Sequence, residues 1–165
     1  GLDQHPGTME MLGEAAVRVE VIRSTTRSAE LQATVDADNG VLYPDLPALQ
    51  AGRALGPIYY PEMINMIRKI SGGGLIQLPV SLAEFDSPIG EALEKSLAGA
   101  GISGRDKSAL MKLAWDLCGS EFGARHELYE MNYAGERSAL LAGIQREYSR
   151  AGHYRDHLTA FMEGL

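Results

Sequence analysis

Hydrophobic residues recur every three or four positions over long stretches of this chain, which is the spacing of one face of an α-helix. The first such stretch follows Thr8, a suitable N-cap, and the spacing predicts a helix over about residues 8–38. Asn39 and Gly40 would end that helix, since both tolerate left-handed backbone angles. No segment sustains the two-residue alternation of a strand. We therefore predict an all-α fold, an antiparallel bundle of long helices with short peripheral ones.

Proline, glycine and serine divide the rest of the chain into further helices. Pro47 suits a first helical position, and Gly56-Pro57 is expected to interrupt the helix that Pro47 opens. Ser87-Pro88 and Ser103 are expected to begin two later helices. The glycines at 72–74 and the segment 132–135 should break the pattern. The expected helices span about residues 61–70, 88–97, 104–131, 136–150 and 154–162.

Composition and charge narrow the function classes. The 165 residues suit one domain, residues 1–165, and 45% hydrophobic with 22% charged residues is ordinary for a globular protein. The net charge of −7, with no lysine or arginine cluster to offset it, argues against nucleic-acid binding. No apolar run approaches the roughly 18–20 residues that span a bilayer, and the start lacks the pattern of a secretion signal. The single cysteine, Cys118, excludes an internal disulfide framework, so we expect a cytoplasmic protein.

The predicted helix at 104–131 carries two hydrophobic stripes, which indicates burial on most sides. One stripe consists of Leu110, Leu113, Leu117, Ala124 and Leu128, and the other of Met111, Trp115, Cys118 and Phe122. Continuing the first stripe by four residues leads to Glu121, a carboxylate where an apolar residue is expected. Gly119 and Gly123 are also four residues apart, and each costs about 1 kcal/mol against alanine in a helix interior.

Two interpretations of this interruption stand side by side. In the first, the glycines allow a close helix crossing, and Glu121 and Arg125 form an ordinary pair one turn apart. In the second, a backbone face without side chains admits a ligand, and the Arg125 guanidinium binds a phosphate. Helical spacing alone favours packing but does not decide between them.

The segment Leu113–Gly135 resembles the C-terminal signature of the 4-hydroxyphenylacetate 3-hydroxylase family, the oxygenase components of two-component monooxygenases that use reduced flavin. The start, Gly1–Pro6 followed by Leu12-Gly-Glu14, resembles the entry into the long bundle helix of that family. Ser71–Pro79 resembles its glycine-rich turn. The resemblance covers nearly the whole chain and is weakest over 80–105.

This resemblance implies the fold of acyl-CoA dehydrogenase-like flavoproteins, of which the chain would supply only the C-terminal helical domain. The N-terminal helical and middle β domains of the family would be absent. In the family, a matching segment contacts FAD, often across a subunit boundary. The cofactor-binding residues carried over in this way are Ser120, Glu121, Phe122, Gly123, Ala124 and Arg125.

The resemblance further implies a parent enzyme that hydroxylates a phenolic substrate with FADH2 supplied by a separate flavin reductase, as a homo-oligomer. No catalytic residue is carried over, because the catalytic residues of the family lie mainly in the two earlier domains. We therefore expect this chain alone to be inactive. The glycine turn at 72–74 either lies close to the flavin ring or serves only as a turn between helices.

Two other functions are weighed against this one. The chain could be a non-catalytic helical self-assembly domain, whose uncovered apolar faces favour association. It could also be the bundle of a related flavin-dependent CoA-ester dehydratase with an iron–sulfur cluster, which a single cysteine argues against. No metal site is expected, because His153 and His157 have zinc-like spacing with Asp156 beside them, but no third ligand set is evident and the pair lies near the end of the chain. Glu121 and His126 have the wrong interval for a di-iron bundle.

Overall fold

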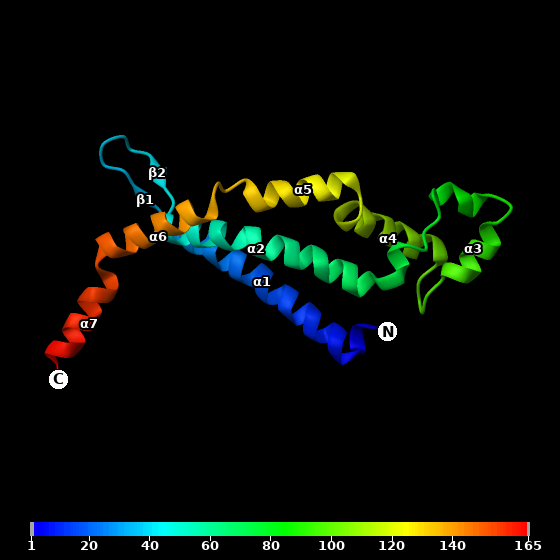
Figure 1. Cartoon of the computed structure of the whole chain (residues 1–165), viewed down its shortest axis with the longest axis horizontal. Helices are drawn as coiled ribbons and strands as arrows, with labels where there is room; N and C mark the ends of the chain where they lie inside the picture. The colour runs from blue at the N-terminus through cyan, green and yellow to red at the C-terminus, as the bar shows by residue number, and fades with distance from the viewer. Residues whose placement is uncertain (1, 165) are drawn as a thin grey trace. The chain divides into compact units, whose positions relative to one another are not determined.

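Helices make up most of the described chain, and its only strands form a two-stranded hairpin (Figure 1). The computed structural model describes residues 2–164, except for the side chains of residues 2, 151, 153 and 154. The helices are α1 (Pro6–Leu31), α2 (Leu46–Ser71), α3 (Gly90–Leu97), α4 (Gly104–Cys118), α5 (Glu121–Asn132), α6 (Arg137–Ala151) and α7 (His153–Glu163). Short 3-10 helices are η1 (Leu2–Gln4), η2 (Gly72–Leu75) and η3 (Leu82–Asp86), and the strands are β1 (Thr34–Val35) and β2 (Leu42–Tyr43). The all-α prediction is confirmed, and the two C-terminal helices lie where the spacing placed them.

Helix α1 ends at Leu31, seven residues before the predicted end, because the chain turns into the β1–β2 hairpin. The Asp36 carboxylate accepts the backbone N–H groups of Asp38 and Asn39 at 2.9 and 3.2 Å, and this bonding closes the turn. Gly40 has φ +69°, a left-handed angle that glycine adopts without strain. The Asn39-Gly40 signal therefore marks a hairpin turn, and its interpretation as a helix end is wrong.

Helix α2 runs without a break through Gly56-Pro57 and Pro61, so the predicted interruption is wrong. Its start is capped by Asp45, whose carboxylate accepts the Ala48 N–H at 2.9 Å. Helix α1 approaches the first half of α2 closely. A side chain at Gly52 would lie 2.8 Å from the Thr25 hydroxyl of α1. These contacts illustrate how tertiary packing outweighs a local preference to break.

The chain divides into two compact units, which are described separately. The second unit comprises Val17–Tyr59 and Glu130–Leu165. In it, Arg53 donates to the Ala134 carbonyl at 3.3 Å, which ties α2 to the turn before α6. Glu136 caps α6, since its carboxylate accepts the N–H groups of Ser138 and Ala139.

The first unit comprises Gly1–Ala16 and Tyr60–Tyr129. Its core is a small cluster in which α2, η2 and α4 meet. The cluster consists of the buried Ile64, Leu75 and Cys118 with the partly buried Tyr60, Ile67, Met111 and Ala114. The predicted end of α2 at the glycine run is confirmed, and Gly72 takes a left-handed φ of +51° there. Through Met111, Ala114 and Cys118, this cluster packs α4 against α2 and η2.

The start of α4 is fixed from two sides. Ser103 caps α4, as predicted. The Glu94 carboxylate of α3 accepts the N–H groups of Gly104 and Arg105 at 2.6 and 3.1 Å, which satisfies two unpaired donors of the first turn. Helix α3 itself begins at Gly90, two residues later than predicted.

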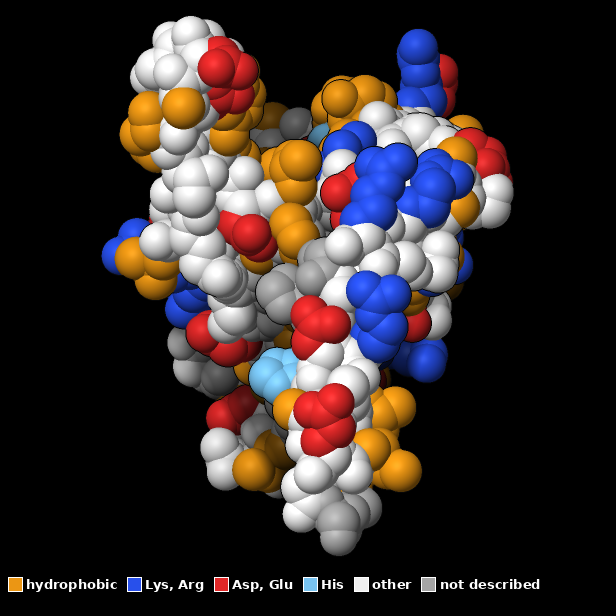
Figure 2. Space-filling model, turned by 90° about the vertical axis from the view of Figure 1, so that its left-hand side faces the viewer, with side chains coloured by type: hydrophobic (Ala, Val, Ile, Leu, Met, Phe, Trp, Pro, Cys, Tyr) orange, Lys and Arg blue, Asp and Glu red, His pale blue; other side chains and the backbone are white. Residues whose placement is uncertain are grey.

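Many large hydrophobic side chains are exposed, and Figure 2 shows such side chains on the surface of one face among charged ones. In α4 they include Leu110, Leu113 and Leu117, which are 43–58% exposed. The prediction that this helix is buried on most sides is therefore wrong for the chain by itself, where only the Met111–Cys118 side packs into the core. None of the helices in the described part is both long enough and apolar enough to cross a membrane.

A pH-dependent ion pair joins η3 to α4. Arg105 donates to both carboxylate oxygens of Asp86 at 2.7 and 3.1 Å, and this bonding holds the pKa of that carboxyl below its ordinary value. A lowered folded-state pKa means that the pair stabilises the fold above the unfolded pKa of about 3.9. The contribution is lost as the pH falls through the lower folded pKa. In an NMR titration we expect Asp86 to titrate below its ordinary range and to return to it in Arg105→Met; an unchanged curve would contradict the pairing.

Candidate functional site

The predicted helix at 104–131 is broken at Gly119 and Ser120, which form an elbow between α4 and α5. At the end of α4, the Trp115 carbonyl accepts the N–H groups of both Gly119 and Ser120, at 2.7 and 2.9 Å. The Ser120 hydroxyl donates to the Asp116 carbonyl at 2.8 Å and accepts the Gly123 N–H at 2.9 Å. Ser120 thus satisfies a carbonyl of one helix and caps the next.

The two glycines of the elbow meet the protein's own atoms. A Cβ at Gly123 would lie 2.6 Å from the carbonyl oxygens of Asp116 and Leu117, and Gly123 is buried against this backbone. At Gly119 the Trp115 ring occupies the corresponding space, 2.5 Å away. The two residues therefore do not form one glycine face along a continuous helix. Their missing side chains let the chain turn tightly.

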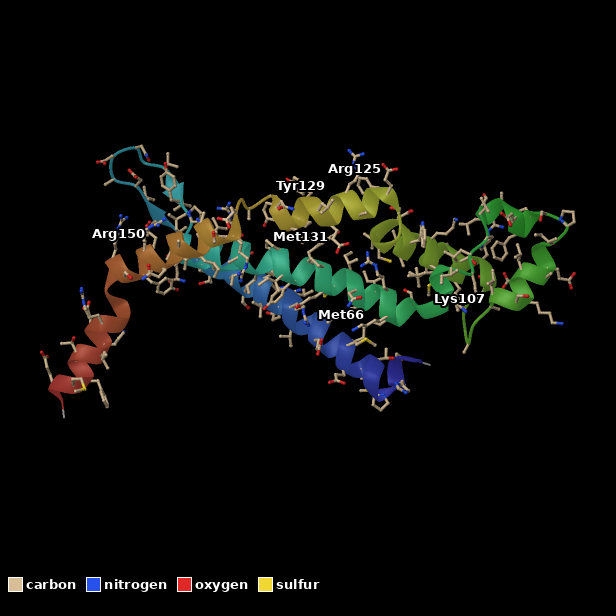
Figure 3. The ribbon with its side chains drawn as sticks, viewed as in Figure 1. Met66, Lys107, Arg125, Tyr129, Met131 and Arg150 are labelled. Atoms are coloured by element: carbon tan, nitrogen blue, oxygen red, sulfur yellow. The ribbon has the colours of Figure 1, made fainter. Side chains whose placement is uncertain are left out.

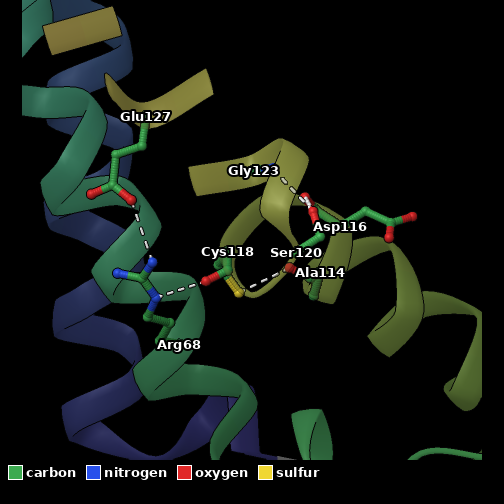
Figure 4. A network of polar contacts seen from close by, with 7 residues as sticks. All are labelled: Arg68, Ala114, Asp116, Cys118, Ser120, Gly123 and Glu127. Carbon is green, nitrogen blue, oxygen red and sulfur yellow. Dashed lines mark hydrogen bonds and ion pairs between the residues drawn. The ribbon is translucent and has the colours of Figure 1, made fainter. Parts of the chain in front are cut away.

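Arg68 of α2 binds both helices that meet at the elbow, as Figure 4 shows. Its Nε donates to the Cys118 carbonyl at 3.0 Å, where α4 ends and unpaired carbonyls carry partial negative charge. Its Nη2 lies 3.3 Å from the Glu127 carboxylate of α5. The Cys118 thiol donates to the Ala114 carbonyl at 2.9 Å, so this buried cysteine packs as part of the elbow. Sequence reasoning did not identify Arg68, because the two partners lie 50 and 59 residues away.

The outer side of α5 presents charged and aromatic side chains to solvent. Glu121 is 91% exposed and Arg125 79% exposed, with 4.0 Å between their charged groups. The expectation that Glu121 is buried is wrong, because the break at Gly119 ends the stripe that led to it. Phe122 is 75% exposed and Ala124 is also exposed. Arg125 extends from α5 away from the body of the helix (Figure 3).

A surface pocket of about 630 Å³ lies along this side of α5. It brings together three of the predicted site residues, Glu121, Phe122 and Arg125, with His126 and Tyr129. The partly buried His126 ring lies 5.4 Å from the Tyr60 ring of α2, 6.1 Å from that of Phe122 and 6.4 Å from that of Tyr129. Sequence reasoning missed His126 and Tyr129 as site residues, although the spacing 122, 126, 129 places three rings on one face.

The predicted site residues thus fall into two groups. Ser120 and Gly123 build the elbow, and the exposed members of the segment form a surface. A guanidinium with an aromatic ring beside it suits a ligand that combines anionic and planar groups. The glycine turn at 72–74 packs against α4, since a Cβ at Gly74 would lie 3.3 Å from the Met111 sulfur. Among the described residues no group of three metal-binding side chains occurs, and the His153 side chain lies outside them.

Comparisons with known sequences agree on one family. The family model described as "4-hydroxyphenylacetate 3-hydroxylase C terminal" matches residues 1–162. The 4-hydroxyphenylacetate 3-monooxygenase oxygenase component of Thermus thermophilus is 36% identical over 163 residues, which cover 99% of this chain and 33% of that protein. Its Escherichia coli counterpart is 36% identical over 154 residues, 89% of this chain and 30% of that protein. The chain therefore spans about a third of the length of these relatives.

Solved structures share the fold. A crystal structure of the oxygenase component of 4-hydroxyphenylacetate 3-monooxygenase complexed with FAD matches with a TM-score of 0.90 and 35% identity, over 99% of this chain and 34% of that one. The same component complexed with FAD and 4-hydroxyphenylacetate matches with a TM-score of 0.89. An archaeal 4-hydroxybutyryl-CoA dehydratase from N. maritimus matches with a TM-score of 0.81 at 22% identity, over 99% of this chain and 32% of that one, which shows the fold alone. The prediction of a helical bundle with the fold of acyl-CoA dehydrogenase-like flavoproteins is confirmed.

The tight elbow leaves no room for a side chain at position 123, which a substitution can test. Gly123→Ala would force a methyl group against two backbone carbonyls, so we expect the free energy of unfolding to fall by about 1–3 kcal/mol, as for overpacking. Gly143→Ala is the matched control, because nothing lies within 4 Å of a Cβ there and α6 should gain up to about 1 kcal/mol. Urea unfolding followed by circular dichroism compares the two. Equal effects would show that the elbow tolerates a side chain.

Proposed function

The chain belongs to the 4-hydroxyphenylacetate 3-hydroxylase family, and from this membership we propose that it is the C-terminal helical domain of a flavin-dependent phenol monooxygenase. The observation that carries the proposal is the match over 99% of the chain to an oxygenase component whose structure is complexed with FAD. The relatives are about three times as long as this chain, and the catalytic domains of the proposed enzyme would lie in the remainder. Residues 1–165 would then form its single C-terminal domain.

We propose that the outer side of α5 contacts FAD. The residues present fit such a ligand: Arg125 offers a guanidinium that is 79% exposed for a charge-assisted bond, and Phe122 offers a ring that is 75% exposed. Glu121, 4.0 Å from Arg125, orients the guanidinium and accepts hydrogen bonds from polar parts of the flavin. His126 and Tyr129 extend the same surface along the pocket.

The other three members of the predicted segment act through shape in this proposal. Ser120 and Gly123 stabilise the turn that sets the direction of α5. The small side chain of Ala124 leaves room for a ligand beside Phe122 and Arg125. The elbow geometry supports this division, because the hydroxyl of Ser120 is already engaged with α4 and α5 backbone atoms.

Reduced FAD, when bound, supplies the chemistry that activates oxygen for hydroxylation of the phenolic substrate. This chain contributes binding, orientation and exclusion of water at one side of the cofactor. No residue of the chain is proposed to act on the substrate. We therefore propose that the chain alone is inactive.

The partners belong to the same proposal. A separate reductase would supply FADH2, as the name "oxygenase component" of the relatives suggests for a multi-component system. A homo-oligomer is supported by the exposed apolar residues of α4, which need a cover. A reducing cytoplasm is supported by Cys118, which is a free, buried thiol.

A non-catalytic helical self-assembly domain is the alternative: the exposed stripe of Leu110, Leu113 and Leu117 suits it, but the match to an oxygenase component complexed with FAD favours the flavin role. Sedimentation and flavin titration of the full-length oxygenase, as wild type and as Arg125→Ala, separate the candidates. A variant that keeps both its oligomeric state and its flavin affinity would favour self-assembly. The CoA-ester dehydratase alternative is not favoured, because its similarity to this chain reaches only the fold.

The flavin role of Arg125 is tested in the full-length oxygenase that carries this segment. Arg125→Ala should weaken FADH2 binding by about 1–3 kcal/mol, as for the loss of a charge-assisted hydrogen bond. Arg23→Ala is the matched control, since Arg23 is also exposed and pairs with a glutamate within its own helix, at 3.2 Å. Anaerobic flavin titration gives both dissociation constants. An unchanged constant for Arg125→Ala would exclude the proposed role.

A further inference from the structure

Arg68 lies on the side of α5 opposite the proposed flavin surface. From there it contacts the Cys118 carbonyl at the end of α4 and the Glu127 carboxylate of α5. We propose that Arg68 is a positioning residue for the flavin, acting through the elbow without touching the cofactor. The inference rests on the proposed function, because it presumes that the outer side of α5 contacts FAD. It assigns a role in cofactor binding to α2, an element that contributes no residue to the predicted segment.

The contacts of Arg68 fix both arms of the elbow at once. Its Nε bond of 3.0 Å to the Cys118 carbonyl holds the end of α4, and its Nη2 contact of 3.3 Å to Glu127 holds the second turn of α5. Two anchors on either side of Gly119-Ser120 define the angle at which α5 leaves α4. Arg68 adds to the Ser120 hydrogen bonds and to the Tyr60–His126 ring contact, and it is the contact among these that joins both arms to α2 through one side chain.

The position of Glu127 on α5 links its contact with Arg68 to the orientation of Arg125. Glu127 is two residues from Arg125, so at 100° per residue the two side chains point to opposite sides of the helix. The Glu127 side chain is 21% exposed, against 79% for Arg125. Pulling Glu127 toward α2 therefore turns Arg125 and Phe122 outward, and loss of the pull lets the outer face rotate.

The chemistry of the contact requires a guanidinium. Nε and Nη2 donate in two directions from one planar group, toward a backbone carbonyl and a carboxylate. A lysine ammonium at the end of a flexible stem presents one point charge and does not reproduce this fixed fork. The charge also complements the C-terminal end of α4.

Arg68→Met in the full-length oxygenase keeps most of the side-chain stem and removes both contacts. We expect the FADH2 dissociation constant to rise about ten-fold, the change that corresponds to loss of roughly one charge-assisted bond at the cofactor. Arg105→Met is the matched control, because it also breaks an arginine–carboxylate pair between elements, with Asp86, away from the α5 surface. Both variants should lose stability, and only Arg68→Met should lose flavin affinity. Equal losses of affinity would overturn the inference.

A double-mutant cycle with Arg125→Ala separates positioning from a general effect. Once Arg68 is replaced, Arg125 is no longer held toward the flavin, so Arg125→Ala should have less effect in Arg68→Met than in the wild type. Additive effects would overturn the inference. Arg68→Lys should recover little affinity; full recovery would also overturn it.

The two proposals fail in different ways. If Arg125→Ala leaves flavin affinity unchanged in the wild-type background, the flavin surface itself is wrong. If Arg125→Ala weakens binding and Arg68→Met does not, the surface stands and only the positioning role is lost. Glu127→Gln provides a second variant with a small change in volume, and we expect its loss of affinity to lie between those of wild type and Arg68→Met.

Discussion

The guanidinium of Arg68 is the contact on which the arrangement of the α4–α5 region depends. A helix that ends at Cys118 leaves backbone carbonyls without partners, and a second helix beginning at Glu121 leaves N–H groups without partners. Ser120 and the Trp115 carbonyl satisfy several of these groups within the chain segment itself. Arg68 of α2 binds the Cys118 carbonyl as well, so a residue 50 positions away in sequence helps to hold the elbow.

The sequence predicted most of the helices, and it failed where a long-range contact decides the outcome. Ser103 and the helices after residue 136 follow from local capping and spacing, which operate within a few residues. The unbroken α2 does not, because packing against α1 overrides a local preference to break. The break in the 104–131 helix has local signals in Gly119 and Ser120, but the Arg68 contact that joins its two arms lies 50 positions away. At the candidate site, the pattern singled out a segment that the structure shows to be an elbow followed by an exposed helical face, and it misjudged the burial of that segment. Glu121 stood out as a charge in a stripe that the structure ends two residues earlier.

The proposed function and the fold place different demands on the same seven residues, Gly119–Arg125. Folding uses the hydroxyl of Ser120 and the absent side chains of Gly119 and Gly123. Flavin contact would use the outward side chains at 121, 122 and 125, which make few demands on the fold of the chain. The two sets lie within one short segment of sequence, and the structure separates them: the first set faces the backbone of the elbow and the second faces solvent.

The buried Gly123 beneath an exposed α5 surface has a practical consequence for protein engineering. Because the turn is set by backbone contacts under the helix, the outward positions 121, 122 and 125 can be randomised in a library while the scaffold beneath them stays intact. Such a library would vary the side chains of the proposed flavin surface without changing the turn that holds it. Substitutions at Ser120 or Gly123 would instead destabilise the turn itself, so these two positions should be left unvaried.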